Sequence, residues 1–287
     1  MIWLIKMRYV NLGCGNHCDS SWINIDIASN NMEVICCDLR KGISLPDNSC
    51  DVVYHSHLIE HLRKNEAKLL LMECFRVLKP GGIIRVAAPD LEKICRAYLE
   101  TLEIARNGEL NGDLDYQWMM LELYDQTVRE NRGGIIKEYL LQNPLRNERF
   151  ILSRIGEEGR TIINLSKKRH SEIPQINKRV VYQAVFKNVA RLIKKIQKTV
   201  IYVIAGKQGL HAFEIGEFRL SGEVHQWMYD TYSMKQLLLD SGFINPIQQS
   251  ADKSLISGFN RFHLDILEDG TVRKPDSFFM EAVKPEK

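Results

Sequence analysis

Residues 9–26 read YVNLGCGNHCDSSWINID, two apolar runs joined by a turn that contains two glycines. The first run ends in Gly13, Cys14 and Gly15, and the second ends eleven residues after Gly15 in Asp26. Glycine allows a tight turn and a close approach of the backbone to a ligand, because it has no Cβ. An acid that closes a strand can accept hydrogen bonds from ribose hydroxyls. The stretch therefore predicts a strand, a ligand-binding turn and a second strand.

Composition and cysteine usage indicate a globular protein of a reducing compartment. The chain has 287 residues, of which 45% are apolar and 26% charged, and no run reaches the roughly 18 apolar residues that a membrane span needs. Residues 1–10 lack the small-residue cleavage site of a signal peptide and are interpreted as the beginning of a first strand. Because the seven cysteines are odd in number, we expect free thiols and a cytoplasmic location. Paired Cys-x-x-Cys spacing is missing, so no metal site is predicted.

The order of elements indicates an α/β protein. Apolar, β-branched runs predict strands at 7–15, 21–28, 34–39, 50–58, 82–89, 244–248 and 277–283. Helical periodicity predicts helices at 65–78, 91–106 and 232–241. Alternation of strands and helices is typical of a mainly parallel sheet with helices on both faces.

The middle of the chain differs in regularity and in charge. Residues 128–207 hold 18 Lys and Arg against 6 Asp and Glu, whereas acids outnumber bases in the remainder. Within this part, apolar residues recur at three- and four-residue steps between basic ones, which predicts a basic amphipathic helix; its apolar positions are Val185, Val189, Leu192, Ile196 and Val200. We therefore predict a core formed by residues 1–106 and 221–287, with a large, mostly helical insertion at 107–220.

Four stretches carry a resemblance to a known family. They are LGCGNHCDSSWINID (12–26), CDLRKGISLPDNSCDVVYHSHLIEHL (37–62), FRVLKPGGIIRVAAPDL (75–91) and RKPDSFFMEAVK (273–284). Together they resemble the class I S-adenosylmethionine-dependent methyltransferases, which have a Rossmann-like sheet. More narrowly, the chain is similar to predicted methyltransferases associated with bacterial surface-polysaccharide and glycan clusters.

This resemblance implies S-adenosylmethionine as cofactor and assigns residues to it. The implied cofactor-binding residues are Gly13, Cys14 and Gly15 under the methionine portion, Asp26 at the ribose, Asp38 and Leu39 at the adenine edge, and His55 and Ser56 in the pocket beyond the fourth strand. One departure from the family pattern concerns the connection after the glycines. Only Asn16–Ser21 precede the second strand, too few for the usual helix, so this part of the site must be a loop closed by His17, Asp19 or Trp22.

Methyl transfer to a hydroxyl requires a base that removes its proton, and His or a carboxylate is the usual choice. Three candidates stand where this fold would place the acceptor: His57, Asp90 and His225. Each has a structural alternative that stays open. His57 could orient the start of a helix and Asp90 could cap one. His225 is favoured, since it lies in a polar Glu-x-His next to Trp227.

Two functions of different classes follow. The first is an S-adenosylmethionine-dependent methyltransferase that acts on an oxygen or nitrogen of a glycan sugar or another small-molecule acceptor. The second is a non-catalytic protein of the same fold that binds a partner or a membrane surface through its basic insertion. For the basic helix, a solvated face and binding to an anionic membrane both stay open. Nucleic acid is the weakest alternative, because aromatic residues are not interleaved with the basic ones.

Overall fold

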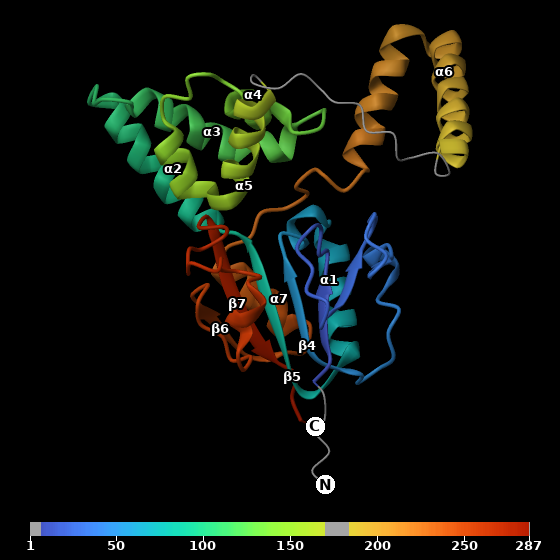
Figure 1. The fold of residues 1–287 in the computed structure, drawn as a ribbon, viewed down its shortest axis with the longest axis vertical. Coiled ribbons are helices and arrows are strands. Elements are labelled where there is room, and N and C mark those ends of the chain that lie inside the picture. The colour runs from blue at the N-terminus through green and yellow to red at the C-terminus, as the bar shows by residue number, and fades with distance from the viewer. Residues whose placement is uncertain (1–6, 170–183, 287) are drawn as a thin grey trace.

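In the computed structural model, residues 7–169 and 184–286 are described, and their centre is one mixed β-sheet (Figure 1). The strand order is β3-β2-β1-β4-β5-β7-β6. The strands are β1 (Tyr9–Leu12), β2 (Ile23–Asp26), β3 (Val34–Cys36), β4 (Cys50–Ser56), β5 (Leu78–Pro89), β6 (Ile244–Gln249) and β7 (Ser277–Val283). The first five pair in parallel, and β7 runs antiparallel to β5 and β6. The predicted α/β fold with a Rossmann-like, mainly parallel sheet is confirmed.

The predicted helices of the core also form. They are α1 (Lys64–Val77), α2 (Leu91–Arg106) and α7 (Thr231–Asp240). α2 begins as expected after Asp90, whose side chain accepts from the Glu92 and Lys93 backbone amides. Residues 1–6 of the expected first strand lie outside the described residues.

The two faces of the sheet are covered in different ways. Alternate side chains of the strands pack with α1 and α7 in one hydrophobic core, which includes Val10, Leu12, Val53, Ile84, Val86, Leu70, Leu71, Met234 and Leu238. Helices were expected on both faces. The opposite face is instead covered, over β1, β4, β5 and β7, by residues 250–276, a loop with the short 3₁₀ helix η3 (Phe259–Phe262). The physical reason is the short connection after β1, which leaves no helix to cover the neighbouring strands.

Aromatic packing fastens this loop to the sheet. Tyr9 stacks on Trp22 with ring centroids 4.9 Å apart. Phe259 of the loop then packs on Tyr54 at 5.5 Å and edge-on against Trp22 at 6.2 Å. Such aromatic pairs stabilise beyond the area that they bury. Trp22, from the shortened connection, is therefore part of the core under the loop.

A buried ion network joins the same loop to the middle of the sheet. Arg85 of β5 is fully buried and donates through Nε to Asp265 and through Nη1 to Glu281 of β7, both at 2.7 Å. Its Nη1 and Nη2 also donate to backbone carbonyls of residues 250–253. Tyr54 donates its hydroxyl to the other oxygen of Asp265 at 2.7 Å. The charged groups are thus paired and hydrogen-bonded, which a buried charge requires.

The long middle part of the chain is helical where it is described. It contains α3 (Gly112–Val128), α4 (Gly134–Leu140), α5 (Glu148–Arg169) and α6 (Ala184–Arg219). α3, α4 and α5 lie together with α2 beyond the carboxyl ends of the strands (Figure 1). A second hydrophobic cluster unites them; it includes Ile94, Trp118, Met119, Tyr139, Leu140, Ile151 and Ile163. In packing, α2 therefore belongs with the insertion, whereas the sequence division at residue 106 assigned it to the core. That division remains a proposal.

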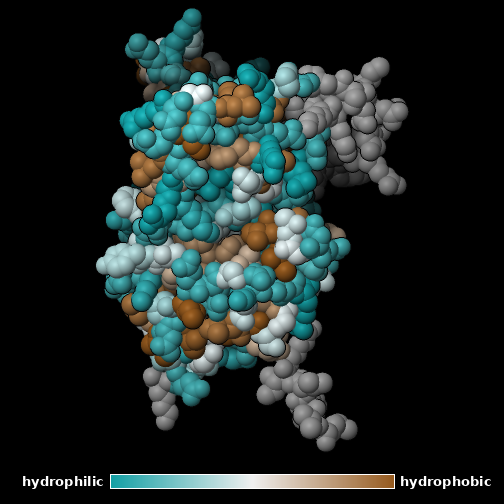
Figure 2. Space-filling model, turned by 90° about the vertical axis from the view of Figure 1, so that its left-hand side faces the viewer, coloured by the Kyte–Doolittle hydropathy of each residue, from teal (hydrophilic) through white to brown (hydrophobic). Residues whose placement is uncertain are grey.

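α6 is a helical hairpin that projects beside these helices (Figure 1). Gly206, with φ of 66° and ψ of −166°, separates its two legs. The predicted basic helix corresponds to the first leg, although the side chains of Val185 and Val189 lie outside the described residues. Among residues 7–169 and 184–286, no helix has the length and apolar content that crossing a bilayer requires. Figure 2 shows the side of the molecule that carries α2 and β6, where hydrophilic residues surround separate hydrophobic patches.

We predict that Arg85→Met lowers the free energy of unfolding by about 3–5 kcal/mol, because Asp265 and Glu281 would stay buried without their counter-charge. Urea denaturation measures the loss. Arg96→Met is the matched control: the Arg96–Glu92 pair at 2.6 Å lies on the exposed surface of α2, and its removal should cost about 0–1 kcal/mol. Equal losses in the two variants would contradict a stabilising role for the buried network.

Candidate functional site

The glycine turn after β1 is shaped by backbone conformations that favour glycine. Gly13 has φ of 63° and Gly15 has φ of 55°. A Cβ on Gly13 would lie only 2.9 Å from a methyl group of Leu58, so a larger residue would collide there. The amide of Gly13 donates to the Ile25 carbonyl at 2.8 Å. The amide of Gly15 donates to the Asp26 carboxylate at 2.8 Å, so the predicted ribose acid also supports the turn.

Residues 16–21 form turns without a helix, as the sequence predicted. Two buried asparagines hold them from inside the sheet. Asn11 of β1 donates to the His17 carbonyl at 3.0 Å, and Asn24 of β2 donates to the Asp19 carbonyl at 2.9 Å. Of the side chains expected to close this loop, Trp22 is buried beneath it, and His17 contacts the Arg273 guanidinium at 2.6–2.7 Å. Residues 16–21 are thus held by contacts with residues 250–276 as well as with the sheet.

A first cavity of about 210 Å³ opens over this turn, at the carboxyl ends of β1 and β4. The residues that line it include Asn11, Gly13, Cys14, Gly15, His17, Ser56, His57, Asp265, Arg273 and Lys274. The carboxyl ends of parallel strands are where open α/β sheets bind their ligands. We call this space the donor cavity. Four of the predicted cofactor residues, Gly13, Cys14, Gly15 and Ser56, line it.

The remaining predicted cofactor residues lie outside the lining of the donor cavity. Asp26 closes β2, and Asp38 follows β3 at the same edge of the sheet. Asp38 accepts from Arg40 at 2.8 and 3.0 Å, and this bond lowers the pKa of its carboxyl. Leu39 is buried in the main core. Binding of ribose and adenine by these residues remains a prediction.

His55 is fully buried, and neither ring nitrogen has a hydrogen-bond partner among the described residues. Burial lowers its pKa to about 4, so the imidazole is neutral at pH 7. The sequence placed His55 in the pocket beyond the fourth strand. The structure places its side chain inside the core instead, because alternate residues of β4 point to opposite faces, and Ser56 is the one that reaches the donor cavity.

A second cavity of about 680 Å³ lies between the carboxyl edge of the sheet and the insertion helices. Its polar lining residues include His57, His61, Glu122, Arg129, Arg132, Lys137, Glu158, Glu223, His225, Lys274 and Asp276. Apolar residues form another part of its wall; they include Trp118, Ile136, Leu140, Ile155 and Ile162. His57 and Lys274 line both this space and the donor cavity. We call it the acceptor cavity.

His57 stands between the two cavities in an uncommon conformation. Its φ of 50° is rare for a non-glycine residue. Its amide donates to the Ala87 carbonyl at 2.9 Å, and its Nε2 lies 2.7 Å from Ser277 Oγ. Burial, followed by the charge of Lys274 and the neighbouring histidines, holds the pKa of His57 well below its ordinary value. The ring is therefore neutral at pH 7, the form in which an imidazole accepts a proton.

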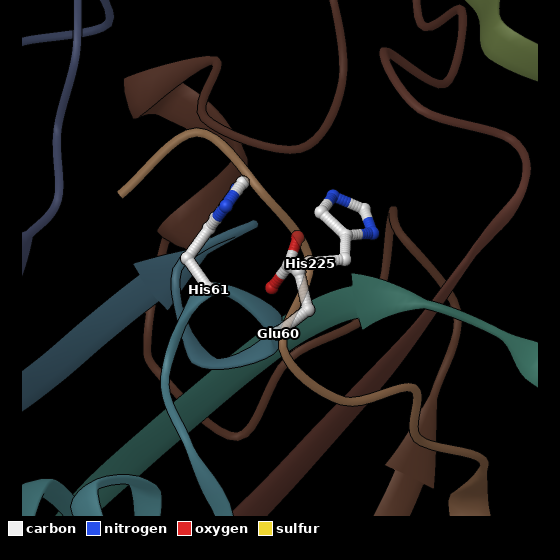
Figure 3. A group of neighbouring side chains, drawn as sticks. All are labelled: Glu60, His61 and His225. Atoms are coloured by element: carbon white, nitrogen blue, oxygen red, sulfur yellow. The ribbon is translucent and has the colours of Figure 1, made fainter. Parts of the chain in front are cut away.

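His225 meets two residues that follow β4, Glu60 and His61 of the 3₁₀ helix η2 (Ile59–His61), as Figure 3 shows. The His225 and His61 rings pack edge to face with centroids 4.7 Å apart. Glu60 is buried, and burial raises its pKa to about 8. Its Oε1 lies 3.4 Å from Nδ1 of His57. Sequence reasoning selected His57 and His225 but missed Glu60; the adjacent polar pair inside IEHL was the available signal.

Asp90, the third predicted catalytic residue, acts as a cap. It is buried, and its carboxylate accepts from the Glu92 amide at 3.1 Å and the Lys93 amide at 3.5 Å. Burial raises its pKa. Asp90 does not belong to the lining of the donor or the acceptor cavity. The geometry favours the capping interpretation that the sequence left open.

Glu223 was not selected from the sequence, but its carboxylate contacts several residues of the insertion close to His225. It accepts from the Gly133 amide at 2.8 Å and from Arg132 at 3.1 Å. Arg129 approaches it at 3.5 Å. Because these groups belong to the turn between α3 and α4, Glu223 fixes one wall of the acceptor cavity.

Comparison with known proteins gives one family match, over part of the chain. Residues 11–86 match a family described as "Methyltransferase domain". A curated protein of Mycolicibacterium smegmatis, "Probable S-adenosylmethionine-dependent methyltransferase/", is 44% identical over 57 residues. That alignment covers 18% of this chain and only 21% of the relative's length.

Solved structures of similar proteins include two described as dependent on S-adenosylmethionine. One is a methyltransferase from Archaeoglobus fulgidus, 13% identical, with a TM-score of 0.37 over 97% of this chain and 86% of its own. The other is a methyltransferase from Mesorhizobium loti, also 13% identical, with a TM-score of 0.36 over 97% of this chain and 91% of its own.

We predict that Cys14 in the glycine turn reacts with iodoacetamide at pH 8 at least about tenfold more slowly than the exposed Cys36, because the thiolate is the reactive form. Burial, with the neighbouring Cys18 as second cause, raises the pKa of Cys14 to about 12. Timed alkylation followed by peptide mass spectrometry measures both rates. Similar rates at the two positions would mean that the turn is open in solution.

Proposed function

We propose that this chain is an S-adenosylmethionine-dependent methyltransferase that takes the methyl donor in the donor cavity and a small acceptor in the acceptor cavity. The match over residues 11–86 indicates a methyltransferase domain. The sheet order, the glycine turn and the cavity at the carboxyl ends of the strands all fit a bound nucleoside cofactor.

One observation carries the proposal: His57 and Lys274 line both cavities, so the two spaces adjoin. Methyl transfer from a sulfonium is an in-line displacement, and its rate depends on holding donor and acceptor in contact with the correct orientation. A donor held over Gly13 and Gly15 would lie in the cavity that His57 and Lys274 border. An acceptor enclosed by the insertion helices would meet it there.

The roles of the donor-binding residues follow from their positions. Gly13, Cys14 and Gly15 would lie under the methionine portion, with Ser56 at the rim. Asp26 would bind the ribose hydroxyls through the carboxylate oxygens that now also hold Gly15 and Ala28. Asp38 and Leu39 would lie at the adenine edge.

The acceptor that we propose is a hydroxyl or amine of a sugar, within a surface glycan or a smaller molecule. Support comes from the lining of the acceptor cavity, where charged side chains able to bind hydroxyl groups stand beside apolar walls. His57 is the residue that we propose as base, because its neutral ring borders both cavities. His225, on the other side of Glu60, would contact the acceptor.

A specific feature of α6 supports a second proposal, peripheral attachment to an anionic membrane at the cytoplasmic side. The first leg of α6 exposes a series of apolar side chains, namely Leu192, Ile193, Ile196, Val200, Val203 and Ile204. Lys194, Lys195 and Lys198 line a shallow groove on the same hairpin. Apolar and basic side chains together are what an interfacial helix presents to anionic lipid. Such attachment would suit a lipid-linked acceptor, or a non-catalytic role.

We predict that the wild-type chain binds S-adenosylmethionine in isothermal titration calorimetry, and that Asp26→Ala weakens this binding by about 1–3 kcal/mol through lost hydrogen bonds. Asp51→Ala is the matched control. Asp51 pairs with Lys79 at 2.8 Å at the amino end of β4, away from the donor cavity, and its removal should leave the affinity unchanged.

Absence of binding by wild type would refute the donor assignment, and equal affinity of Asp26→Ala would refute the ribose placement. Methyl transfer itself is tested by adding the protein and a donor with a labelled methyl group to a cell extract. Mass spectrometry then identifies the labelled product. Donor binding without a labelled product would favour the non-catalytic alternative.

For the membrane proposal, we predict that the chain sediments with anionic liposomes at low salt and is released at high salt, because exposed charges are screened. Replacing both Val203 and Ile204, 76% and 80% exposed, by Asp should abolish sedimentation. Leu110→Asp is the control, since Leu110 is 89% exposed on the turn between α2 and α3. Wild type that stays in the supernatant at low salt would exclude the attachment.

A further inference from the structure

The side chains of Glu60, His61 and His225 converge on one another, and a role in proton transfer alone would not require all three to do so. Each side chain offers one ligand atom, and these atoms all lie within 4.8 Å of one another (Figure 3). The cluster joins parts of the chain that are far apart in sequence. Glu60 and His61 follow β4, whereas His225 stands where the chain returns from α6.

Backbone hydrogen bonds hold the two segments of this cluster in place. The Gln226 amide donates to the Glu60 carbonyl at 2.7 Å, and the His225 amide donates to the Gln126 carbonyl of α3 at 2.9 Å. The three side chains therefore converge because their backbones are fixed, and no hydrogen bond between the side chains is needed to bring them together.

Burial without partners points to a missing ligand. Glu60 is 1% exposed and His225 is 5% exposed. Among the described residues, neither carboxylate oxygen of Glu60 has a hydrogen-bond partner, although Oε1 lies 3.4 Å from Nδ1 of His57, and Nδ1 of His61 and Nδ1 of His225 have none either. Buried polar atoms are nearly always satisfied by protein, water or a bound ion. Unpartnered carboxylate and imidazole atoms on three clustered side chains are what a cation site presents.

We propose that Glu60, His61 and His225 bind one divalent first-row transition-metal ion of the zinc, cobalt or iron type. Imidazole nitrogens favour these ions, whereas Mg²⁺ and Ca²⁺ prefer sites made of oxygen ligands. Bonds of about 2.0–2.1 Å to a tetrahedral ion place ligand atoms about 3.4 Å apart, so small side-chain rotations close the site. The sequence expectation of no metal rested on the cysteines; this site contains none.

The charges around the cluster are compatible with a cation. Lys274 and Arg129 line the same cavity, but Arg129 is paired with Asp125 at 3.1 Å and approaches Glu223 at 3.5 Å. Asp276, Glu122 and Glu158 add carboxyl groups to the lining of the cavity. The arrangement surrounds the cluster with acids as well as bases.

The role of this ion rests on the proposed methyltransferase function. His61 and His225 line the acceptor cavity, so the open coordination positions of the ion would face an acceptor bound there. A hydroxyl bound to the ion loses its proton more readily. The proton would pass to His57, which borders both cavities, and the oxygen would bond to the methyl carbon as the carbon–sulfur bond of the donor breaks.

The full chain, stripped with EDTA, is titrated with Zn²⁺ and Co²⁺ in a calorimeter. We expect one ion per chain, and at least about 100-fold weaker binding for His225→Asn and for His61→Asn, because loss of a ligand exceeds the effect of outer-shell changes. His61 is half-buried, so its variant carries less risk to folding than a change at Glu60. Zn²⁺ should also raise the melting temperature of wild type but not of either variant.

His263→Asn controls for nonspecific binding to surface histidines; His263 has φ of 49°, a conformation that Asn tolerates. The Co²⁺ absorption spectrum separates imidazole and carboxylate ligation from binding to the exposed thiols. Three results would each overturn the proposal: no stoichiometric binding by wild type, unchanged affinity in both histidine variants, or a thiolate spectrum. Donor binding is measured on the stripped protein, so failure of the methyltransferase proposal is recorded independently.

Discussion

The guanidinium of Arg85 is buried between the sheet and residues 250–276, where it is paired with Asp265 and Glu281. Removing such a charge from water is costly, and the cost is offset only when every donor finds an acceptor. Here the acceptors come from β7, from Asp265 and from backbone carbonyls of the loop. The loop can therefore occupy only one position relative to β5, because any displacement would leave a buried charge without partners.

The position of this loop determines the site as well as the fold. The segment that begins with the Arg85 contacts continues into Arg273 and Lys274, which line the donor cavity, and then into Asp276 of the acceptor cavity. Ser277, the next residue, contacts His57. A face that other α/β proteins cover with helices is thus covered here by a chain segment that also supplies polar groups to the site. The shortened connection after β1 makes this possible, because it leaves the face free for the loop.

Local sequence signals were sufficient for most elements. Apolar alternation predicted the strands, and Asp90 followed by a periodic segment predicted α2 residue by residue. Arg85 gave no local signal, because its partners Asp265 and Glu281 lie 180 and 196 residues away. Glu60 was missed for a related reason. A carboxylate within IEHL resembles the start of a helix. Its place in a cluster is recognised only when the fold brings His225, which follows the insertion, next to it. The short loop after the glycines was predicted, but its anchoring by Asn11 and Asn24 depends on side chains inside the sheet.

The chain enters and leaves the segment of α2 to α6 at residues that lie side by side. The Leu91 amide donates to the Tyr229 carbonyl at 2.8 Å, and Asp90 pairs with Tyr229 as an isolated bridge. Closing a loop whose ends are already in contact adds little entropy cost per added residue. Insertions of very different length could therefore be exchanged between these residues while the strand pairing stays the same. In an evolutionary sense, the wall that the insertion helices give to the acceptor cavity could change without a change in the sheet, whereas His57 and Lys274, which line both cavities, would stay in place.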